Sequence, residues 1–412
     1  MAGKHERSAM QFAAAITRCE NVQDAVAHLV DSLRRQMSGE VDLLVLFLTP
    51  EYQDDAPQLS RALRLALAPR VLLGCTCEGV IGGDREIERE PAISVLAGQL
   101  PGVTLAPFHI GMEEWESLLD QNDSSRLKRI LALSPGDTEP TRAYIVLADP
   151  FTTPIAELMQ SLDDLTPQAP TLGGMCSGAQ QAGRNLLFLN GQILEDGAIG
   201  VRIAGPVTVD TVVSQGCRPI GETLLITKAE GNRIAALSGQ NALERTQEML
   251  SDLPESDKEL LSNGLFLGVV VNEYQSDFGR GDFLIRPVFG ADKKTGAIAV
   301  GDTVRAGQTI QYHVRDARTA DEDLRELMQQ AAENEVAPAG GLLFSCNGRG
   351  VRLFDMPNHD VRGVLEAVPE TPLAGFFAQG EFGPIGGRSF LHGHTLSVAL
   401  FRPLRQDESG LP

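Results

Sequence analysis

One sequence unit is written three times along this chain, and it limits the folds that the chain can adopt. Each copy has a short apolar strand, a helical stretch, a second strand that breaks into glycines and a further apolar strand. The strands fall at residues 41–48, 71–79 and 92–97, at 143–148, 171–178 and 198–203, and at 341–350, 373–383 and 395–400. Two apolar strands joined by a helix form a βαβ crossover, which makes the strands parallel. The repetition therefore predicts an α/β protein whose ligands meet the carboxyl ends of the strands.

The spacing of the glycine breaks relates the three copies to one another. From the end of the first strand to the break is 26 residues in the first copy (48 to 74) and in the second (148 to 174). In the third copy the same distance is 30 residues (345 to 375). This spacing aligns Gly74 with Gly174 and Gly375, and it predicts that the three breaks lie close together.

Composition and charge exclude several classes of function. The 412 residues suffice for two or three domains, and 42% of them are hydrophobic, as in ordinary globular proteins. The formal net charge of −20 repels nucleic acid and anionic membrane surfaces, so neither is an expected partner. The sequence contains no apolar run long enough for a membrane helix, and residues 12–16 are too short for a signal-peptide core. We expect a cytoplasmic protein with reduced cysteines.

The remaining patterns complete the predicted architecture. Residues 10–17 read as a strand, an amphipathic helix follows Asn21, and residues 112–140 are expected to hold one helix and a loop. Between the second and third copies we predict strands at 207–214, 222–228 and 264–272, a helix at 234–250, and an antiparallel meander at 282–289, 297–300 and 308–314. A charged helix at 320–334 leads into the third copy. The prediction is an α/β fold of two domains, residues 10–230 and 231–403, with mixed β-sheets and flanking helices, built from diverged βαβ-type repeats.

Several of these motifs resemble a known family. Residues 344–350, 357–360, 375–387 and 392–395 resemble the C-terminal domain of FIST proteins, a name that stands for F-box and intracellular signal transduction. Residues 74–79, 91–95 and 173–178 resemble the matching N-terminal domain, and 282–286 with 301–316 fit the start of the C-terminal one. The likeness covers residues 10–403, which is nearly the whole chain.

The resemblance implies a sensory module. FIST domains are thought to bind small ligands, amino acids among them, and they often lie beside signalling output domains or an F-box. Only short segments flank residues 10–403 in this sequence. We therefore expect no output domain of its own, and we expect any signal to reach a separate signalling protein.

Charged residues at the glycine breaks are candidate ligand contacts. Arg349 lies between two glycines and Arg388 follows two, and a guanidinium fork suits a carboxylate or phosphate. Glu381, in a glycine-rich loop, would receive an ammonium group and complete an amino-acid site. Backbone N–H groups at Gly74 and Gly174 would approach the ligand closely. The alternatives are structural ion pairs, a solvated loop carboxylate and glycines that serve only tight turns.

Other residues at the strand ends support a second interpretation. Cys75, Cys176 and Cys346 lie at glycine-rich strand ends, where backbone dipoles activate thiolates, so a thiol or acid/base enzyme is the alternative function. The same cysteines are equally consistent with small buried residues. Glu78 and Asn347 are further polar groups at these ends, and with the three cysteines they complete the predicted set of ligand-binding residues. Asn358 is a natural helix N-cap.

Metal and cofactor sites are not predicted. His359, His392 and His394 and the Cys75-x-Cys77 pair contain ligand types, but the usual paired Cys-x-x-Cys spacing is absent. The function that we predict is non-enzymatic binding of a small anionic or zwitterionic molecule. A protein-interaction scaffold is the third possibility.

Overall fold

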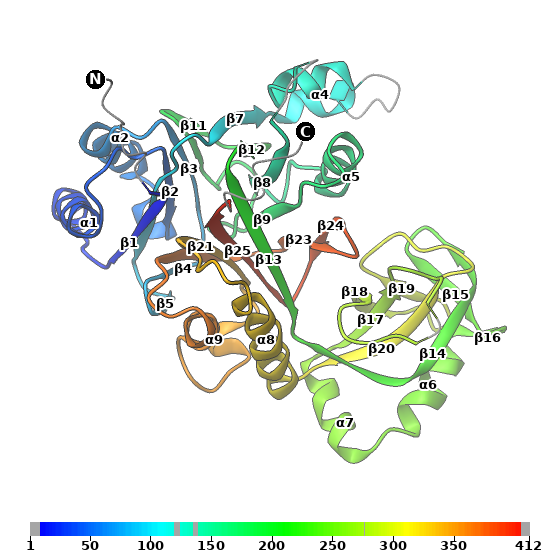
Figure 1. Ribbon diagram of the computed structural model, residues 1–412. Coiled ribbons are helices and arrows are strands. Elements are labelled where there is room, and N and C mark those ends of the chain that lie inside the picture. The colour runs from blue at the N-terminus through cyan, green and yellow to red at the C-terminus, as the bar shows by residue number, and fades with distance from the viewer. Residues whose placement is uncertain (1–8, 119–123, 135–138, 276, 405–412) are drawn as a thin grey trace. The chain divides into compact units, whose positions relative to one another are not determined.

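The computed structural model describes residues 9–118, 124–134, 139–275 and 277–404, and it has two compact units (Figure 1). The first unit comprises the described residues within 1–213, 325–391 and 395–412. The second comprises 214–324 and 392–394. Each unit combines strands with helices, so the α/β fold of two domains with mixed sheets is confirmed. The division of the sequence at residue 230 stays a prediction.

Three six-stranded sheets build the first unit. The first sheet runs β1 (Gln11–Thr17), β6 (Ile93–Gln99), β2 (Leu43–Leu48), β3 (Val71–Thr76), β10 (Leu187–Leu189), β11 (Gln192–Leu194). The second sheet runs β7 (Thr104–Ile110), β12 (Ala198–Ala204), β8 (Thr141–Ala148), β9 (Thr171–Met175), β23 (Glu381–Ile385), β24 (Arg388–His392). The third sheet runs β13 (Val207–Gln215), β25 (Thr395–Pro403), β21 (Gly340–Cys346), β22 (Leu373–Ala378), β4 (Gly79–Gly82), β5 (Arg85–Glu88).

The three sheets repeat one pattern of pairing. Each contains one parallel pair, β2–β3, β8–β9 or β21–β22, as the βαβ repeat predicts. The antiparallel strand β6, β12 or β25 then inserts beside the first strand of that pair. The parallel strands are buried on both faces, which explains why they read as continuous apolar runs rather than alternating ones.

The hairpin that follows each parallel pair joins a different sheet, and the sequence does not predict this arrangement. The hairpin β4–β5 follows β3 of the first sheet but pairs with β22 of the third. The hairpin β10–β11 follows β9 of the second sheet but pairs with β3 of the first. The hairpin β23–β24 follows β22 of the third sheet but pairs with β9 of the second. Because each copy completes another copy's sheet, the glycine-rich strand ends that precede the hairpins are drawn together.

A shared core lies between the three sheets, and helices cover their other faces. Phe47 of the first sheet packs on Phe376 of the third with ring centroids 4.9 Å apart, and Phe12 stacks on Phe401 at 5.1 Å. Helices α1 (Val22–Gln36) and α2 (Ala56–Leu67) bury their apolar faces on the first sheet. Helices α3 (Trp115–Leu118), α4 (Ser125–Ile130) and α5 (Ile155–Leu165) cover the second.

Several local predictions can be compared with these elements. The predicted strand at 10–17 and the helix after Asn21 are confirmed, because the Asn21 side chain accepts from the backbone N–H groups of Gln23 and Asp24 and caps α1. The charged helix is α8 (Ala317–Ala332), and the helix of the third copy is α9 (His359–Ala367). Of the helix and loop expected at 112–140, residues 119–123 and 135–138 lie outside the described part. Its described part holds α3 and α4.

The second unit is an antiparallel sheet that closes on itself. Its strands run β14 (Cys217–Glu230), β20 (Thr309–Arg315), β17 (Leu265–Val270), β18 (Phe283–Ala291), β19 (Ile298–Val300), β15 (Arg233–Leu237) and β16 (Gln240–Asn241), and β14 also pairs with β15. The three antiparallel strands predicted at 282–289, 297–300 and 308–314 are present, but the predicted meander is wrong in its last step, because β20 pairs with β17 and β14 and not with β19. The predicted helix at 234–250 is wrong in its first part, because residues there form β15 and β16 before α6 (Ala242–Ser251) begins. Asn241 caps α6, and α7 (Glu255–Leu260) follows.

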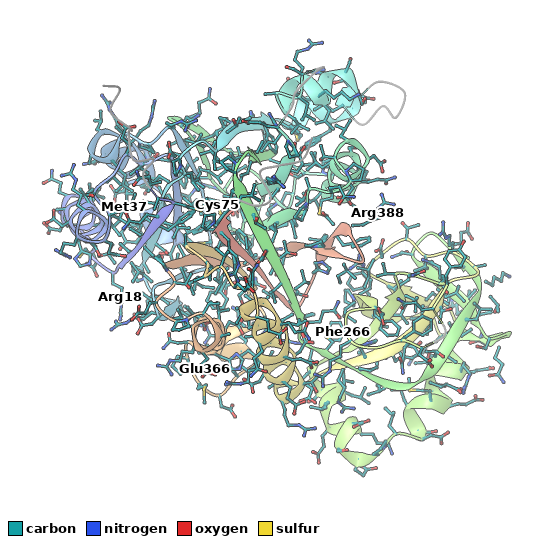
Figure 2. All side chains as sticks on the ribbon, in the orientation of Figure 1. Arg18, Met37, Cys75, Phe266, Glu366 and Arg388 are labelled. Carbon is teal, nitrogen blue, oxygen red and sulfur yellow. The ribbon has the colours of Figure 1, made fainter. Side chains whose placement is uncertain are left out.

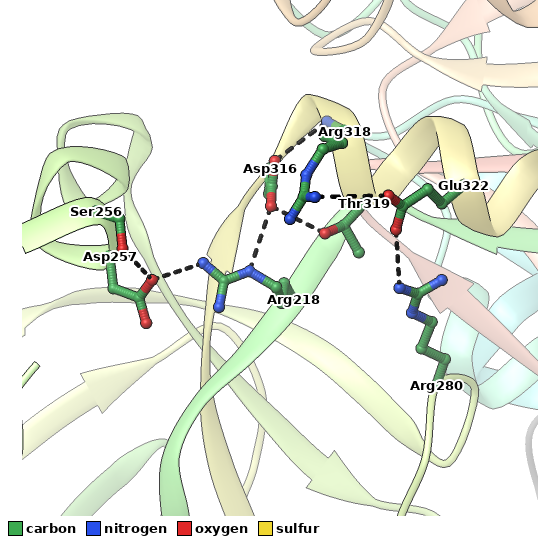
Figure 3. A network of polar contacts seen from close by, with 8 residues as sticks. All are labelled: Arg218, Ser256, Asp257, Arg280, Asp316, Arg318, Thr319 and Glu322. Carbon is green, nitrogen blue, oxygen red and sulfur yellow. Dashed lines mark hydrogen bonds and ion pairs between the residues drawn. The ribbon is translucent and has the colours of Figure 1, made fainter. Parts of the chain in front are cut away.

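An ion-pair network joins two parts of the second unit. Arg218 donates to Asp257 of α7 at 2.8 Å and to Asp316, just before α8, at 3.2 Å (Figure 3). Glu322 of α8 accepts from Arg280 at 3.3 Å. Because these groups are paired and partly exposed, the network fits a structural role.

Candidate ligand-binding site

The three glycine-rich strand ends meet in the first unit, as the sequence predicts. Ser177, after β9, accepts a hydrogen bond from the backbone N–H of Glu78 at 2.8 Å, and its hydroxyl donates to the carbonyl of Phe377. The backbone N–H of Met175 donates to the carbonyl of Gly380 at 2.8 Å. These bonds tie the ends of β3, β9 and β22 into one junction.

The glycines of the breaks allow neighbouring strands to approach closely. A Cβ atom on one glycine of each break would lie 2.0, 1.8 or 1.9 Å from a carbonyl oxygen of the parallel neighbour. The glycines are Gly74, Gly173 and Gly375, and the carbonyls belong to Leu46, Val146 and Leu343. The alignment of Gly174 with Gly74 is therefore off by one residue. A Cβ on Gly174 would lie 2.8 Å from that of Ala378, so its close contact is with another strand end. Packing accounts for these glycines, and their contact with a ligand stays a prediction.

The thiols of the first two breaks lie in the apolar core. Cys75, Cys77 and Cys176 are fully buried, and Figure 2 labels Cys75 among the strands of the first unit. Burial raises the pKa of Cys75 well above its ordinary value, and a hydrogen bond with Cys176 raises it further. Burial likewise raises the pKa of Cys77. A buried protonated thiol is a poor nucleophile, which weighs against a thiol enzyme at these positions.

The side chains of Glu78 and Asn347 contact each other at the junction. The Asn347 amide donates to Glu78 Oε2 at 3.1 Å, and Arg352 donates to Glu78 Oε1. Glu78 belongs to the first copy, and the other two belong to the third. The predicted polar groups therefore converge across copies, and Arg352 is an addition that the sequence did not single out.

Arg349 forms a buried ion pair. Its Nε and Nη2 both lie 2.8 Å from the carboxylate oxygens of Asp360, and both side chains are fully buried. Ser345 donates to the same carboxylate at 2.7 Å, and His359 Nδ1 lies 3.0 Å from it. Burial is the largest effect and raises the pKa of Asp360, but the Arg349 charge and the hydrogen bonds from Arg349 and His359 together outweigh it and hold that pKa well below its usual range. The geometry matches the structural ion pair that was the alternative for Arg349.

Glu381 lies beside Arg349, so the two charges predicted to form one site do meet. Glu381 is fully buried, accepts from the backbone N–H of Thr395 at 3.2 Å, and interacts with Cys346 and the Arg349 charge. Burial raises the pKa of its carboxyl well above the ordinary value. Arg349 Nη1 and Glu381 Oε1 have no hydrogen-bond partner among the described residues.

Arg388 lies apart from this cluster. It is half exposed on β24 of the second sheet, where Figure 2 labels it, and it pairs with Asp163 and Asp164 of α5. Arg388 is thus the predicted residue whose charge is already paired on α5, while the others gather at or beside the junction.

A cavity of about 470 Å³ opens next to the buried ion pair, between β5 and the start of α9. Its lining includes Arg85, Glu86 and Glu88 of β5 with Asn358 and Arg362. Glu86 is only 7% exposed, and its Oε2 has no hydrogen-bond partner among the described residues. Burial, followed by the nearby Asp360 charge, raises the pKa of Glu86 to about 8. The cavity therefore has a largely neutral carboxyl in its wall at neutral pH.

The start of α9 explains why Glu86 is held there. Asn358 occupies the N-cap position with a positive φ of 64°, but its side chain makes no capping bond and instead accepts from the backbone N–H of Glu86 at 2.7 Å. Glu86 Oε1 accepts from the backbone N–H of Val361 at 2.8 Å and so caps the helix from another strand. The predicted N-cap position of Asn358 is confirmed, whereas the capping bond comes from Glu86.

The cations of the cavity differ in how they are paired. Arg18 forms an ion pair with Glu90, and Arg85 lies 3.9 Å from Asp84. The guanidinium of Arg362, on the exposed side of α9, has no partner among the described residues. An unpaired guanidinium and a buried carboxyl thus line one cavity, an arrangement that suits a molecule with groups of both signs.

Sequence reasoning missed Glu86 and Arg362. The run of residues 82–86 contains a turn signal, two glycines and an aspartate, and predicts a hairpin. Glu86 could have been singled out as an acidic residue on the strand β5 of that hairpin, at a position that the structure shows to be buried. Its helix partner lies 275 positions further along the chain, because β4–β5 joins the third sheet.

Comparison with known proteins agrees with this architecture. The model of the FIST N domain matches residues 42–240, and that of the FIST C domain matches residues 242–384. This chain belongs to the FIST family. FIST domains are associated with signal transduction and sensing.

Two mycobacterial relatives match nearly the whole length of this FIST protein, and a plant relative matches part of it. An uncharacterized protein of Mycobacterium tuberculosis is 38% identical over 398 residues, which cover 95% of this chain and 100% of the relative. Another, of Mycobacterium bovis, is 36% identical over 396 residues, covering 95% and 99%. An F-box/LRR-repeat protein of Arabidopsis thaliana is 26% identical over 173 residues, covering 39% of this chain and 31% of its own.

Two further properties of this FIST protein concern membranes and metals. Within residues 9–118, 124–134, 139–275 and 277–404, no helix has the length and apolar character needed to cross a membrane. In the same residues, no three His, Cys, Asp or Glu side chains are grouped so that they could hold a metal ion.

Proposed function

We propose that this FIST protein is a cytoplasmic sensor that binds a small carboxylate or zwitterion, with amino acids as the first candidates, and that it signals through a separate protein. The binding site in this proposal is the cavity between β5 and α9. The observation that carries it is the cavity wall, which contains Glu86, whose buried Oε2 lacks a partner, and the unpaired guanidinium of Arg362, both within the part of the chain that the structure describes.

The size and charge of the cavity support a small ligand of mixed charge. Its volume of about 470 Å³ lies within the range of small-molecule sites. Arg362 would hold a carboxylate, and Glu86 with Glu88 would face the cationic end. Burial also raises the pKa of Glu88, although the Val351 N–H bond opposes that change. Asp360 lies in the first turn of α9, so its buried ion pair with Arg349 would keep that turn in place.

A thermal-shift screen tests this proposal. The panel contains the L-amino acids, dicarboxylates and primary amines, and the wild type is compared with Arg362→Ala and Arg388→Ala. We expect a zwitterion to raise the melting temperature of the wild type and of Arg388→Ala but not of Arg362→Ala, because a ligand stabilises only the form that binds it. Both arginines are exposed, so their removal should change stability itself little. If no compound stabilises the wild type, or if Arg362→Ala responds fully, this site is wrong.

A further inference from the structure

Glu86 has a geometry that is unusual for a carboxyl group in a folded protein. It is more than nine-tenths buried, yet only Oε1 is bonded, to the Val361 N–H, while Oε2 has no partner among the described residues. A buried carboxylate with one unsatisfied oxygen is costly, and protonation removes most of that cost.

The carboxylates near Glu86 favour its neutral form, as burial does. Asp360 at the start of α9 and Glu88 on the same strand face it as like charges, and Arg349 is the opposing charge. Because Arg349 already forms two bonds with Asp360, it neutralises that residue first. The remaining charged groups of the cavity wall are Arg18, Asp84, Arg85, Glu90 and Arg362. Arg18 is occupied by Glu90.

We propose that Glu86 selects the cationic end of the ligand by exchanging its carboxyl proton for that cation. This inference rests on the proposed function and adds its chemistry. In the empty cavity Glu86 is neutral, and its proton avoids a second buried negative charge beside Asp360. When an ammonium or guanidinium group binds in the cavity, the carboxyl ionises, its proton leaves for bulk water, and the positive charge of the bound cation replaces that of the proton beside the cavity wall. The charge of the wall is then unchanged, so binding a cation releases one proton.

Direct titration of the carboxyl tests this exchange without knowledge of the natural ligand. The protein is labelled with ¹³C at the glutamate carboxyls, and Glu86→Gln identifies the resonance that disappears. Glu86→Asp serves the same assignment if the first variant does not fold. Guanidinium chloride at non-denaturing millimolar concentration is the cation probe, and sodium chloride at equal ionic strength is the control.

The expected titration midpoint of Glu86 is near pH 8 without a probe. Guanidinium should lower it by about one pH unit relative to sodium, which corresponds to a tenfold preference of the cation for the ionised form. A midpoint at the ordinary glutamate value, or identical midpoints in the two salts, overturns the inference.

The outcomes separate this inference from the proposed function. If a zwitterion binds through Arg362 while Glu86 titrates as an ordinary glutamate, only the proton exchange is wrong. If guanidinium shifts Glu86 but no small metabolite stabilises the protein, the exchange stands and the ligand class is wrong.

Discussion

Two hairpins of the first unit make the same kind of junction with a helix, but among the described residues the side chain that follows the arginine is fully bonded in only one of them. β4–β5 joins the third sheet beside α9, and β23–β24 joins the second sheet beside α5. The second strand of each begins with arginine, followed by the residue that reaches the helix, Glu86 in one and Ser389 in the other. Ser389 is fully engaged, because its N–H donates to Asp163 at 2.9 Å and its hydroxyl accepts from the Thr171 N–H at 3.0 Å.

The difference between the junctions lies in their chemistry and not in their topology. At the second sheet a small hydroxyl closes the contact. At the third sheet a carboxyl caps the helix with one oxygen and leaves the other unused beside a cavity. A repeat fold thus supplies equivalent positions, and one of them is specialised by a single larger, ionisable side chain. In such a repeat fold, a position whose buried polar group lacks the hydrogen bonds that the equivalent position makes is therefore a candidate functional site.

The largest expected effect comes from the buried ion pair behind the third junction. Arg349→Ala leaves Asp360 buried without its cation, so we expect a loss of about 3–5 kcal/mol in the free energy of unfolding. Urea denaturation measures this change. The matched double variant with Asp360→Asn should recover part of the loss, because it removes the uncompensated charge. A loss below that of an exposed ion pair would show that the pair does not support α9.

The second largest effect is a pH-dependent change in the free energy of unfolding, which we expect at the β4–β5 junction and not at the β23–β24 junction. The folded pKa of Glu86, about 8, lies above its ordinary value of 4.5, so its contribution to stability is fully present below about pH 4.5 and is lost as pH rises through about 8. Glu86→Gln cannot ionise and should therefore gain stability relative to the wild type across that window, by on the order of a few kcal/mol.

Unfolding curves at several pH values measure this difference. Ser389→Ala is the control at the equivalent position, since it removes no ionisable group and its effect should not vary with pH. A Glu86→Gln difference that stays constant across the window contradicts a neutral Glu86.

A smaller effect is expected at Asn358, which holds the backbone of Glu86. Asn358→Gly keeps the left-handed conformation but loses the 2.7 Å bond to the Glu86 N–H, and should cost about 1 kcal/mol. Asn358→Ala also strains the positive φ, so its cost should be larger by roughly another 1 kcal/mol. If the two variants lose the same unfolding free energy, the left-handed conformation at this position does not contribute to the difference.

The sequence predicted the parts of the fold that are local. The strand–helix–strand units, the N-cap Asn21 and the parallel pairs follow from apolar runs and capping residues that are close in the chain. The strand β15 was missed because the pattern of residues 234–237 fits a helix or a strand. The hairpin exchange could not be read, since a short hairpin carries no signal for the sheet that it joins. For that reason Glu86 as the cap of α9 was not found. Asp360 was missed for another reason: an ion pair was expected as the alternative for Arg349, but the sequence does not select which of its many acidic residues is the partner.

The smallest expected effect completes the comparison at the second junction. Arg388 is half exposed, and its contacts with Asp163 and Asp164 at 3.8 and 3.4 Å are long, so Arg388→Ala should cost less than about 0.5 kcal/mol and less still in high salt. Asp163 differs from its neighbour because burial raises its pKa while the Ser389 N–H bond opposes that change. Asp163→Asn should therefore cost more than Arg388→Ala, through the hydrogen bond and not the ion pair. Urea denaturation at low and high salt distinguishes these contributions: a salt-independent loss at Arg388, or a loss there as large as that at Asp163, would contradict this division between ion pair and hydrogen bond.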